Sequence, residues 1–494
     1  MLREAAMAPN YELRNEMMTE LVPTETENKA MLPALQTEAA RNLDEVYRTM
    51  AMRPLVTQKE RDAFYRDMNP VRGGDKIAHI QRDLERERGV SHFKGFFMGH
   101  SGVGKSTEIN RLTGFIENKF RVVRLNALED LNPADFRPFD LLFVLILNLM
   151  QALHAAGIGD KIASELLNNL YNWFRISDYT QFYEAHQENE SSKEAGMPKK
   201  ISEFIGLLFN IKESRRYITS RQEKTTEYSY KTMGQLVKLM NRLFVAANLL
   251  IQAEGREWVI IGEEFDKPGV SPARVEELFI EHANIFTELQ THLIFNIPSA
   301  LAYSEKTQAL PKVTRYPIFD TPVYDAQHQP HLEGRKALRG VMDARMNPGL
   351  FAEGQQERLI VASGGNLSEL FSLTVAAADN AALRRGANGK VEAQDVTQAI
   401  GEKRRDYRNA LGSSPYDANP VPYAGKAARL EAVYNLESGY RMPDRVLYIL
   451  ILARAVQEFN GESWLGLHPL VVDILKSDER LKPADGGDIP GGTI

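Results

Sequence analysis

The segment Gly99 to Thr107, with the sequence GHSGVGKST, constrains this chain more than any other feature. It satisfies the pattern G-x-x-x-x-G-K-[ST], in which glycines let successive backbone N–H groups converge on phosphate. Lys105 would then neutralise charge on the β- and γ-phosphates, Ser106 would ligate magnesium, and Thr107 would contact the α-phosphate. A helix beginning there adds its positive dipole end. The predicted phosphate-binding residues are Gly99, His100, Ser101, Gly102, Val103, Gly104, Lys105, Ser106 and Thr107.

The segments around this loop supply the context that the pattern requires. The apolar run His92 to Met98 predicts a strand before the loop, and Lys105 to Thr113 has helical spacing after it. A flexible glycine-rich turn, the alternative, needs neither. Further apolar runs predict buried parallel strands at 120–125, 258–262 and 292–297, and a strongly apolar helix is expected at 138–156. We therefore predict an α/β fold with a P-loop NTPase core and a parallel sheet.

The composition is that of a globular chain. Of its 494 residues, 43% are hydrophobic and 26% are charged, which argues against global disorder. The absence of cysteine excludes disulfides and thiolate metal sites and favours a reducing, cytoplasmic location. The N-terminus lacks the apolar core of a signal peptide, and the longest apolar run, Phe139 to Leu149, is too short to cross a bilayer. The net charge of −6 gives no sign of a globally basic nucleic-acid surface.

Apolar spacing and the density of proline and glycine divide the chain into segments. The expected order is an N-terminal helical segment 1–55, a P-loop core 56–325 with a helical insertion at about 157–227, a helical lid 326–412, a linker 413–434, a C-terminal helical or winged-helix-like module 435–482 and a loose tail 483–494. Helices are expected in the lid at 332–345, 355–362, 367–384 and 393–411, and in the C-terminal module at 443–459 and 467–477.

Two acids, Glu263 and Glu264, directly follow the apolar run Trp258 to Gly262. Nucleotide hydrolysis needs a carboxylate at the end of a second strand to hold the magnesium shell, and usually another acid to orient or deprotonate water. The alternative is a solvated acidic loop after a buried strand, and the upstream phosphate motif argues against it. Asp266 is the reserve acid and is otherwise expected to be a structural cap or a subunit contact.

Residues 56 to 412 resemble one branch of the AAA+ ATPases. The likeness rests on GHSGVGKSTE, WVIIGEEFDK, HLIFNIPSA, and SGGNLSEL followed by VEAQDVTQAI. That branch holds origin-recognition ATPases, transposition regulators and bacterial STAND or conflict-system ATPases, which share a P-loop core and a helical lid. The resemblance implies that Glu263 replaces the usual magnesium-linked aspartate and that Glu264 activates water. Because glutamate has the longer arm, slow turnover is expected.

The resemblance implies roles for two further residues and a departure at a third. Asn296 matches the position that hydrogen-bonds the attacking water or the γ-phosphate, although a strand-end asparagine is as commonly a turn former. Arg315, in LPKVTR, matches an arginine finger that completes a neighbouring subunit's site, and an exposed arginine in a salt bridge is the alternative. Ser368 falls where an arginine sensor often lies in the lid.

Two other groups of residues have structural interpretations. Arg215, Arg216 and Arg221 of the insertion have no catalytic spacing, and a solvated helical face is the preferred interpretation. Trp464 and His468 lie in a run that would suit a winged-helix-like or partner-binding module. The histidine is expected to be structural, because no second histidine or cysteine lies near it in sequence to form a metal site.

These patterns lead to one primary expectation and two alternatives. The primary expectation is a slow ATPase that uses ATP and Mg²⁺ and whose nucleotide state sets self-assembly. The resemblance implies that it is the sensor or scaffold of a bacterial anti-phage defence system, a homo-oligomer with an effector protein as partner and no membrane contact. One alternative is a DNA-binding loader or regulator of the origin-recognition or transposition type. The other is a nucleotide-bound scaffold with negligible turnover.

Overall fold

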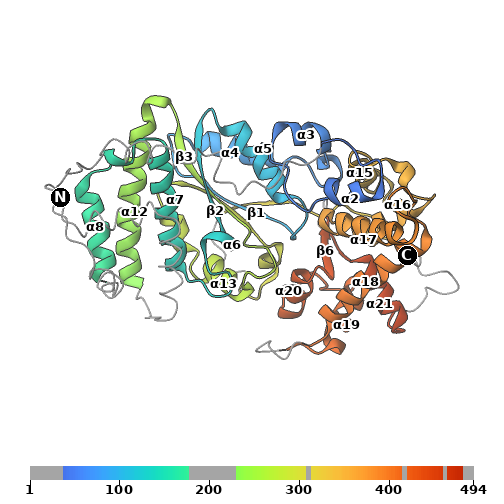
Figure 1. Cartoon of the computed structure of the whole chain (residues 1–494). Coiled ribbons are helices and arrows are strands. Elements are labelled where there is room, and N and C mark those ends of the chain that lie inside the picture. Colours follow the sequence, from blue (N-terminus) through green and yellow to red (C-terminus); the bar gives the residue numbers. More distant parts are fainter. Residues whose placement is uncertain (1–36, 177–229, 307–312, 414–419, 460–463, 482–494) are drawn as a thin grey trace, which may run out of the picture.

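The structure is a computed structural model that describes residues 37–176, 230–306, 313–413, 420–459 and 464–481. An α/β core occupies one part of the molecule, and helices from the second half of the chain lie beside it (Figure 1). A five-stranded parallel sheet runs through the core in the order β2-β3-β4-β1-β5. The strands are β1 Lys94–Met98, β2 Phe120–Asn126, β3 Glu257–Glu263, β4 His292–Ile297 and β5 Thr314–Pro317. The predicted α/β fold with a parallel sheet is confirmed.

Helices cover both faces of this sheet. One face carries α4 (Lys76–Glu87) and α5 (Lys105–Ile116), and the other carries α7 (Pro138–Ala155) and α12 (Tyr230–Ile251). Alternate residues of β3 serve the two cores, since Val259 and Ile261 pack on the α5 side while Trp258 and Ile260 pack on the α7 side. Burial on both faces explains why the strands read as continuous apolar runs.

The fifth strand, β5, was not predicted. It pairs in parallel with β1 at the edge of the sheet, with Arg315 opposite Phe96. Among its four residues only Tyr316 is buried. A short edge strand with one buried side chain has no apolar run, so periodicity alone does not reveal it.

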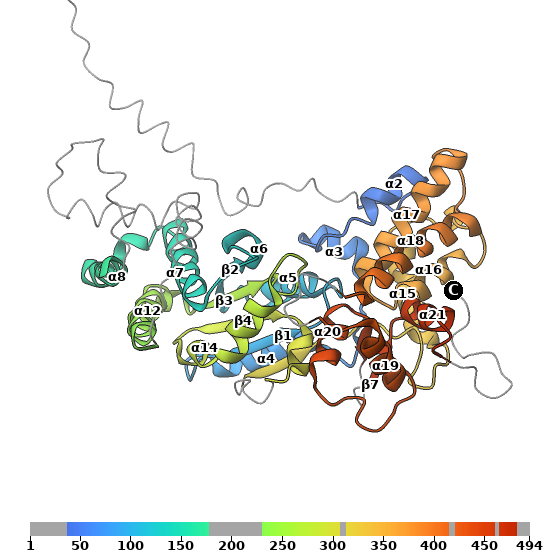
Figure 2. The ribbon, with the colours of Figure 1, turned by 90° about the horizontal axis from the view of Figure 1, so that it is seen from below.

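The remaining helices of the core are short or belong to the insertion. They are α3 Gln58–Phe64, α6 Ala127–Asp130, α8 Ser164–Ile176, α13 Pro272–Glu276 and α14 Asn284–Glu288. Helices α8 and α12 lie side by side at the end of the core away from the lid (Figures 1 and 2). Residues 177–229, which include Arg215, Arg216 and Arg221, lie outside the described ranges.

Two helices of the described ranges are longer apolar segments than the run Phe139 to Leu149 that the sequence analysis singles out. Pro138–Ala155 and Met233–Glu254 are long and apolar enough to cross a bilayer by length and composition alone, which corrects the expectation that no stretch is. The apolar face of α7 continues past Leu149 through Met150 and Leu153, both fully buried. Since 72% of this helix is buried against the sheet and its neighbours, the protein core explains its apolar character. The second helix is 39% buried.

Each of the four helices expected between residues 332 and 411 is present, with ends within two residues of those expected. The helices of this lid are α15 Leu332–Asp343, α16 Gln355–Ala362, α17 Leu367–Arg385 and α18 Ala393–Leu411. The N-terminal helix α2 (Leu43–Thr49) packs against α17 in the same hydrophobic core. The described part of the N-terminal segment is therefore joined to the lid.

The C-terminal module differs from the expectation in two respects. Its elements are α19 Tyr423–Tyr434, α20 Arg445–Leu452, β6 Val456–Phe459, β7 Trp464–Leu467 and α21 Pro469–Ser477. The expected linker 413–434 contains α19, whose Ala427, Leu430 and Val433 are buried. The helix expected at 443–459 ends at Leu452, because Arg454 takes a left-handed φ of 57° and the chain continues as an antiparallel hairpin.

Candidate nucleotide-binding site

The loop between β1 and α5 forms a cradle of backbone donors. Gly102 and Gly104 have φ angles of 85° and 106°, which glycine adopts without strain. Within the described ranges, the backbone N–H groups of Gly104, Lys105 and Ser106 have no hydrogen-bond acceptor. They lie at the positive end of α5, so they are available to phosphate.

Lys105 is buried behind this loop. Its Nζ donates to the carbonyl oxygens of Gly99 at 2.8 Å and His100 at 2.7 Å, and it lies 2.9 Å from Asp266 Oδ2. Burial lowers the pKa of Lys105, while Asp266 opposes that effect. Asp266, expected as the reserve acid, is therefore the counter-ion of Lys105 in this structure.

Ser106 and Glu263, the two residues predicted to hold magnesium, lie together. Glu263 ends β3, and its buried carboxylate accepts a hydrogen bond from Arg124 of β2. The Ser106 hydroxyl lies close enough to lower the pKa of this carboxyl group. Burial raises the pKa of Glu263 against the effect of Arg124. Arg124 also donates to Asn110 and Thr113 of α5, at 2.8 Å each. The arginine thus fixes β3 relative to the helix that carries Ser106.

Glu264 turns away from the strand with an unusual backbone. Its φ is 68°, in the left-handed region that residues other than glycine seldom occupy. The half-buried carboxylate lies close to Asn126, the last residue of β2. Burial raises its pKa, with Asn126 opposing. A carboxylate whose pKa is raised, held at the carboxyl edge of the sheet, is a stronger base than an exposed one and is suited to accept a proton from water.

Asn296 lies inside β4 and is 1% exposed. Its Oδ1 is buried and has no hydrogen-bond partner in the described part of the chain. Gly262 of β3 lies opposite Phe295 of β4, so continuing the register by one residue places Asn296 level with Glu263. The unpaired oxygen is therefore an acceptor beside the acidic strand.

Thr107 holds a preceding segment of the chain. Its Oγ1 accepts the backbone N–H of Leu55 at 3.1 Å, and Asn110 Nδ2 donates to the Leu55 carbonyl at 3.0 Å. The Thr107 N–H bonds to Gly104 at 3.1 Å. The groups of Thr107 expected to contact the α-phosphate are thus engaged within the protein, although the hydroxyl can still donate its proton.

A buried carboxylate that the sequence did not reveal joins three parts of the molecule. Asp320 Oδ2 lies 2.7 Å from His100 Nδ1 and accepts from Gln457 Nε2 at 2.8 Å, and its Oδ1 accepts from Asn366 Nδ2 at 2.9 Å. Burial would raise the pKa of Asp320, but His100 and the two amides outweigh it and hold that pKa well below its usual range. Asp320 therefore links the phosphate loop, the lid and the C-terminal module.

The lid contacts the loop through the turn before α17. Ser368, which replaces the arginine sensor that the resemblance implies, donates its N–H to the Gly102 carbonyl at 3.1 Å. A Cβ added to Gly102 would come within 2.7 Å of the Ser368 Cβ. Buried Arg72, also missed, donates to the Val103 carbonyl at 3.0 Å and to Thr321 Oγ1 at 2.9 Å. None of these contacts has a local sequence pattern.

Two residues singled out in the sequence lie away from the phosphate loop and the strand ends beside it. Arg315 is exposed on the edge strand β5, so its role as a finger toward another subunit stays a prediction. His468 is buried, caps α21 by accepting the Leu470 N–H at 3.3 Å, and lies 3.2 Å from Glu369 Oε2. The histidine has the structural position that was expected.

The residues present fit a nucleotide phosphate with magnesium. The unbonded N–H groups at the start of α5 suit phosphate oxygens, and Lys105 supplies a buried positive charge. A serine hydroxyl and a carboxylate in contact are oxygen donors of the kind that magnesium prefers. The arrangement of β1, the loop and α5 is that of a P-loop NTPase core.

Comparisons with known proteins give distant likenesses only. No protein-family model and no curated protein matches the chain. The ORC1 protein of Aeropyrum pernix in complex with DNA is 14% identical, with 88% of this chain and 96% of that chain covered and a TM-score of 0.34. The Walker-type ATPase PABY2304 of Pyrococcus abyssi is 13% identical, with 87% and 99% covered and a TM-score of 0.36. The RuvB Holliday junction branch migration motor of Thermotoga maritima is 10% identical, with 85% and 99% covered and a TM-score of 0.33.

Proposed function

We propose that this chain is a P-loop ATPase that binds ATP with Mg²⁺ at residues 99–107 and hydrolyses it slowly. The observation that carries the proposal is that Ser106, at the start of α5, and Glu263, at the end of β3, lie close together beside the unbonded N–H groups of the loop. It brings an anion cradle and a pair of oxygen ligands to one edge of the sheet. That combination suits a magnesium-bound polyphosphate better than a free anion.

The chemistry follows from where each side chain lies. Lys105 and the loop N–H groups bind and orient the phosphates. Magnesium, when bound, neutralises charge on the phosphate oxygens. Glu264 accepts a proton from the attacking water, and the Asn296 oxygen helps to orient that water. The water oxygen bonds to the γ-phosphorus as the bond from that phosphorus to the bridging oxygen breaks, which releases ADP and phosphate.

The biological setting rests on the resemblance alone. We infer a cytoplasmic homo-oligomer whose nucleotide state controls assembly and engagement of an effector protein, as the sensor or scaffold of an anti-phage defence system. Exposed Arg315, on an edge strand, is accessible to a neighbouring subunit, which supports its proposed role as a finger. The alternative of a nucleotide-bound scaffold with negligible turnover is distinguished from the slow ATPase by the rate of phosphate release, which would be negligible for the scaffold.

A magnesium titration tests the proposed site. ATP binding should be measured by calorimetry at increasing Mg²⁺ for the parent, Ser106→Ala, Glu263→Gln and the control Glu117→Gln, whose residue is exposed at the far end of α5. The parent and the control should bind ATP more tightly as Mg²⁺ rises. The two site variants should lose most of that dependence. Equal magnesium dependence in all four proteins would contradict the proposal.

One observation favours a second candidate function, a DNA-binding ATPase of the loader or regulator type. Arg404, Arg405 and Arg408 of α18 line a groove together with Glu402 of the same helix and Ser477 of α21. Such a basic face suits a phosphate backbone. Gel-shift titration with duplex DNA should then show affinity that falls steeply with salt, and a double Arg404→Ala, Arg405→Ala variant should reduce that slope. No shift at low salt with ATP and Mg²⁺ would exclude this candidate.

A further inference from the structure

The C-terminal module contacts the phosphate loop directly. The Ser101 carbonyl accepts hydrogen bonds from Asn366 Nδ2 of the lid at 3.0 Å and from Arg454 Nη1 of the module at 3.3 Å. Arg454 follows Ser101 by 353 residues in the sequence. A residue from the last quarter of the chain thus forms part of the support of the loop.

The setting of Arg454 is specific. It follows α20 and takes a φ of 57°, although it is not a glycine. Its other terminal nitrogen, Nη2, lies 3.0 Å from Glu369 Oε1, and that carboxylate is 2% exposed. The strained backbone and the buried counter-ion together hold the guanidinium toward Ser101. Both terminal nitrogens of the Arg454 guanidinium are therefore held, Nη1 by the Ser101 carbonyl and Nη2 by the Glu369 carboxylate.

Gln457 makes a second link between the module and the loop. Its Nε2 donates to Asp320 Oδ2 at 2.8 Å, the same oxygen that lies 2.7 Å from His100 Nδ1. It also donates to the Gly364 carbonyl of the lid at 3.0 Å. A shift of His100 therefore acts on the oxygen that binds Gln457.

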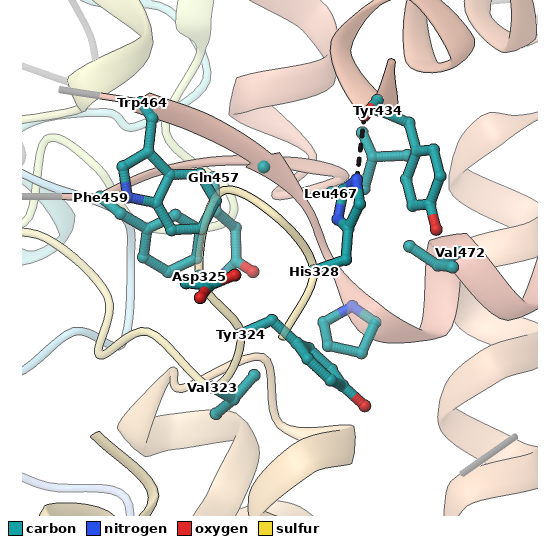
Figure 3. Close-up of a pocket in the computed structure, with 12 residues that line it drawn as sticks. Val323, Tyr324, Asp325, His328, Tyr434, Gln457, Phe459, Trp464, Leu467 and Val472 are labelled. Carbon is teal, nitrogen blue, oxygen red and sulfur yellow. Dashed lines mark hydrogen bonds between the residues drawn. The ribbon is translucent and has the colours of Figure 1, made fainter. Parts of the chain in front are cut away.

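Aromatic side chains join the module to the segment that follows Asp320. Figure 3 shows His328 beside Tyr434 of α19, with ring centroids 4.0 Å apart and a hydrogen bond of 3.0 Å from His328 Nε2 to the Tyr434 carbonyl. Gln457 lines the same pocket with Phe459 and Trp464, whose rings stack at 4.4 Å. The module thus packs as a unit on the chain segment that carries Asp320.

We propose that the C-terminal module is the nucleotide-sensing element of this protein, and that Arg454 and Gln457 are positioning residues for its phosphate loop. The inference rests on the proposed function. Nucleotide binding at the loop and docking of the module favour each other, because both need the same arrangement of the loop. The ligand that the module senses is the nucleoside triphosphate with magnesium that we propose above for the phosphate loop.

The geometry gives the sign of this coupling. Donors from the lid and the module bind the loop carbonyls of Ser101 and Gly102, whereas the N–H groups of Gly104 to Ser106 have no partner within the described ranges. Fixing these carbonyls orders the loop for phosphate before phosphate binds. By linkage, phosphate binding then stabilises the docked module by the same factor.

Hydrogen exchange on the parent chain tests the coupling without a mutation. Backbone exchange in β6 and α21 should become slower when ATP and Mg²⁺ are added, although neither element is expected to touch the nucleotide. Exchange that is unchanged in these elements while it slows in the loop would overturn the inference and leave the proposed function intact. A parent chain that binds no ATP would overturn both.

Arg454→Ala tests the proposed role of Arg454 in positioning the phosphate loop. We expect KM for ATP to rise about tenfold, the loss of one charge-assisted hydrogen bond, with kcat changed by less than about twofold. The slowing of exchange in β6 and α21 should also disappear. Arg454→Lys, which keeps the charge beside Glu369, should restore stability and part of the affinity for ATP.

The matched control is Arg429→Ala in the same module. Arg429 pairs with Asp444 at 3.0 Å and donates to the Met442 carbonyl at 2.7 Å, so its contacts stay within the module. It should lower stability and leave KM and the exchange response unchanged. Gln457→Leu should raise KM as Arg454→Ala does. Parental KM and exchange response in both Arg454→Ala and Gln457→Leu would overturn the inference.

Discussion

Lys105 Nζ lies 2.9 Å from Asp266 Oδ2, and the two side chains are only 3% and 2% exposed. The positive charge that would bind phosphate is therefore already paired with a carboxylate from the segment after β3. A bound phosphate has to share Lys105 with Asp266. This relationship couples phosphate binding to the acidic segment that carries Glu263 and Glu264.

Asp266→Asn tests this pairing. Removing one partner of a buried ion pair should destabilise the protein by about 3 kcal/mol, because Lys105 keeps only two carbonyl acceptors. Since phosphate supplies the missing negative charge, ATP with Mg²⁺ should raise the apparent melting temperature of the variant more than that of the parent. The control is Asp62→Asn, exposed on α3. An ATP-induced shift equal to that of the parent would contradict the pairing.

Glu264→Gln tests the proposed base. ATP should still bind, and hydrolysis should fall by about two to four orders of magnitude. Because burial raises the pKa of Glu264 above its usual 4.5, parental kcat should rise with pH through that raised pKa, and the variant should lack this limb. The rate of phosphate release, measured across pH for the parent and for Glu264→Gln, tests both expectations. Parental turnover in Glu264→Gln would assign the chemistry elsewhere or show that the parent has no turnover.

The elements around the site were predictable where a periodic pattern or a spaced motif marks them. Strands β1, β3 and β4 are buried on both faces, so each appears as an apolar run, and the loop motif places α5. The position of Glu263 and Glu264 follows from the end of β3. The pairing of Asp266 with Lys105 did not follow, because it depends on how the segment after β3 folds back toward the loop.

Gly365→Ala tests the close approach of the lid to the core. Gly365 has a φ of 79°, and a Cβ there would lie 1.7 Å from the Thr321 carbonyl oxygen. The lid would have to move, and we expect a loss of about 3 kcal/mol from overpacking and backbone strain together. Gly354→Ala is the matched control, because it has the same φ of 79° and nothing within 4 Å. Equal melting temperatures for the two variants would contradict this account.

Glu369 gives the stability of the lid and C-terminal module a pH dependence. Burial would raise its pKa, but His468, Arg454 and Lys403 outweigh it and lower the pKa to about 2 from the usual 4.5. The contribution of this carboxylate is therefore present above pH 4.5 and is lost as pH falls toward 2, and it amounts to about 3 kcal/mol.

Urea unfolding of Glu369→Gln between pH 7 and pH 3 measures this contribution. The variant should be less stable at pH 7, and the difference from the parent should shrink as pH falls. Glu333→Gln, whose residue is exposed on α15, is the control and should follow the parent. A difference between Glu369→Gln and the parent that stays constant with pH would contradict the role given to the carboxylate.

The sequence did not predict the residues that support the site from a distance. The loop is contacted from separate parts of the chain by Arg72, Asp320 and Arg454. Gln457 acts on it through Asp320, and none of the four residues belongs to a spaced motif. Their roles depend on tertiary packing, which brings single polar side chains together in a buried place. The strand β6 was mistaken for helix for a related reason, since the turn at Arg454 is set by its contacts with Glu369 and Ser101.

Calorimetric titration of ATP with Mg²⁺ into the parent and Lys105→Ala tests the central claim most directly. The control is Lys119→Ala, which removes a lysine paired with Glu85 near the far end of α5. If residues 99–107 form the phosphate site, the parent and the control bind ATP, and Lys105→Ala binds it at least about a hundredfold more weakly while remaining folded. Parental affinity in a folded Lys105→Ala variant would contradict the account.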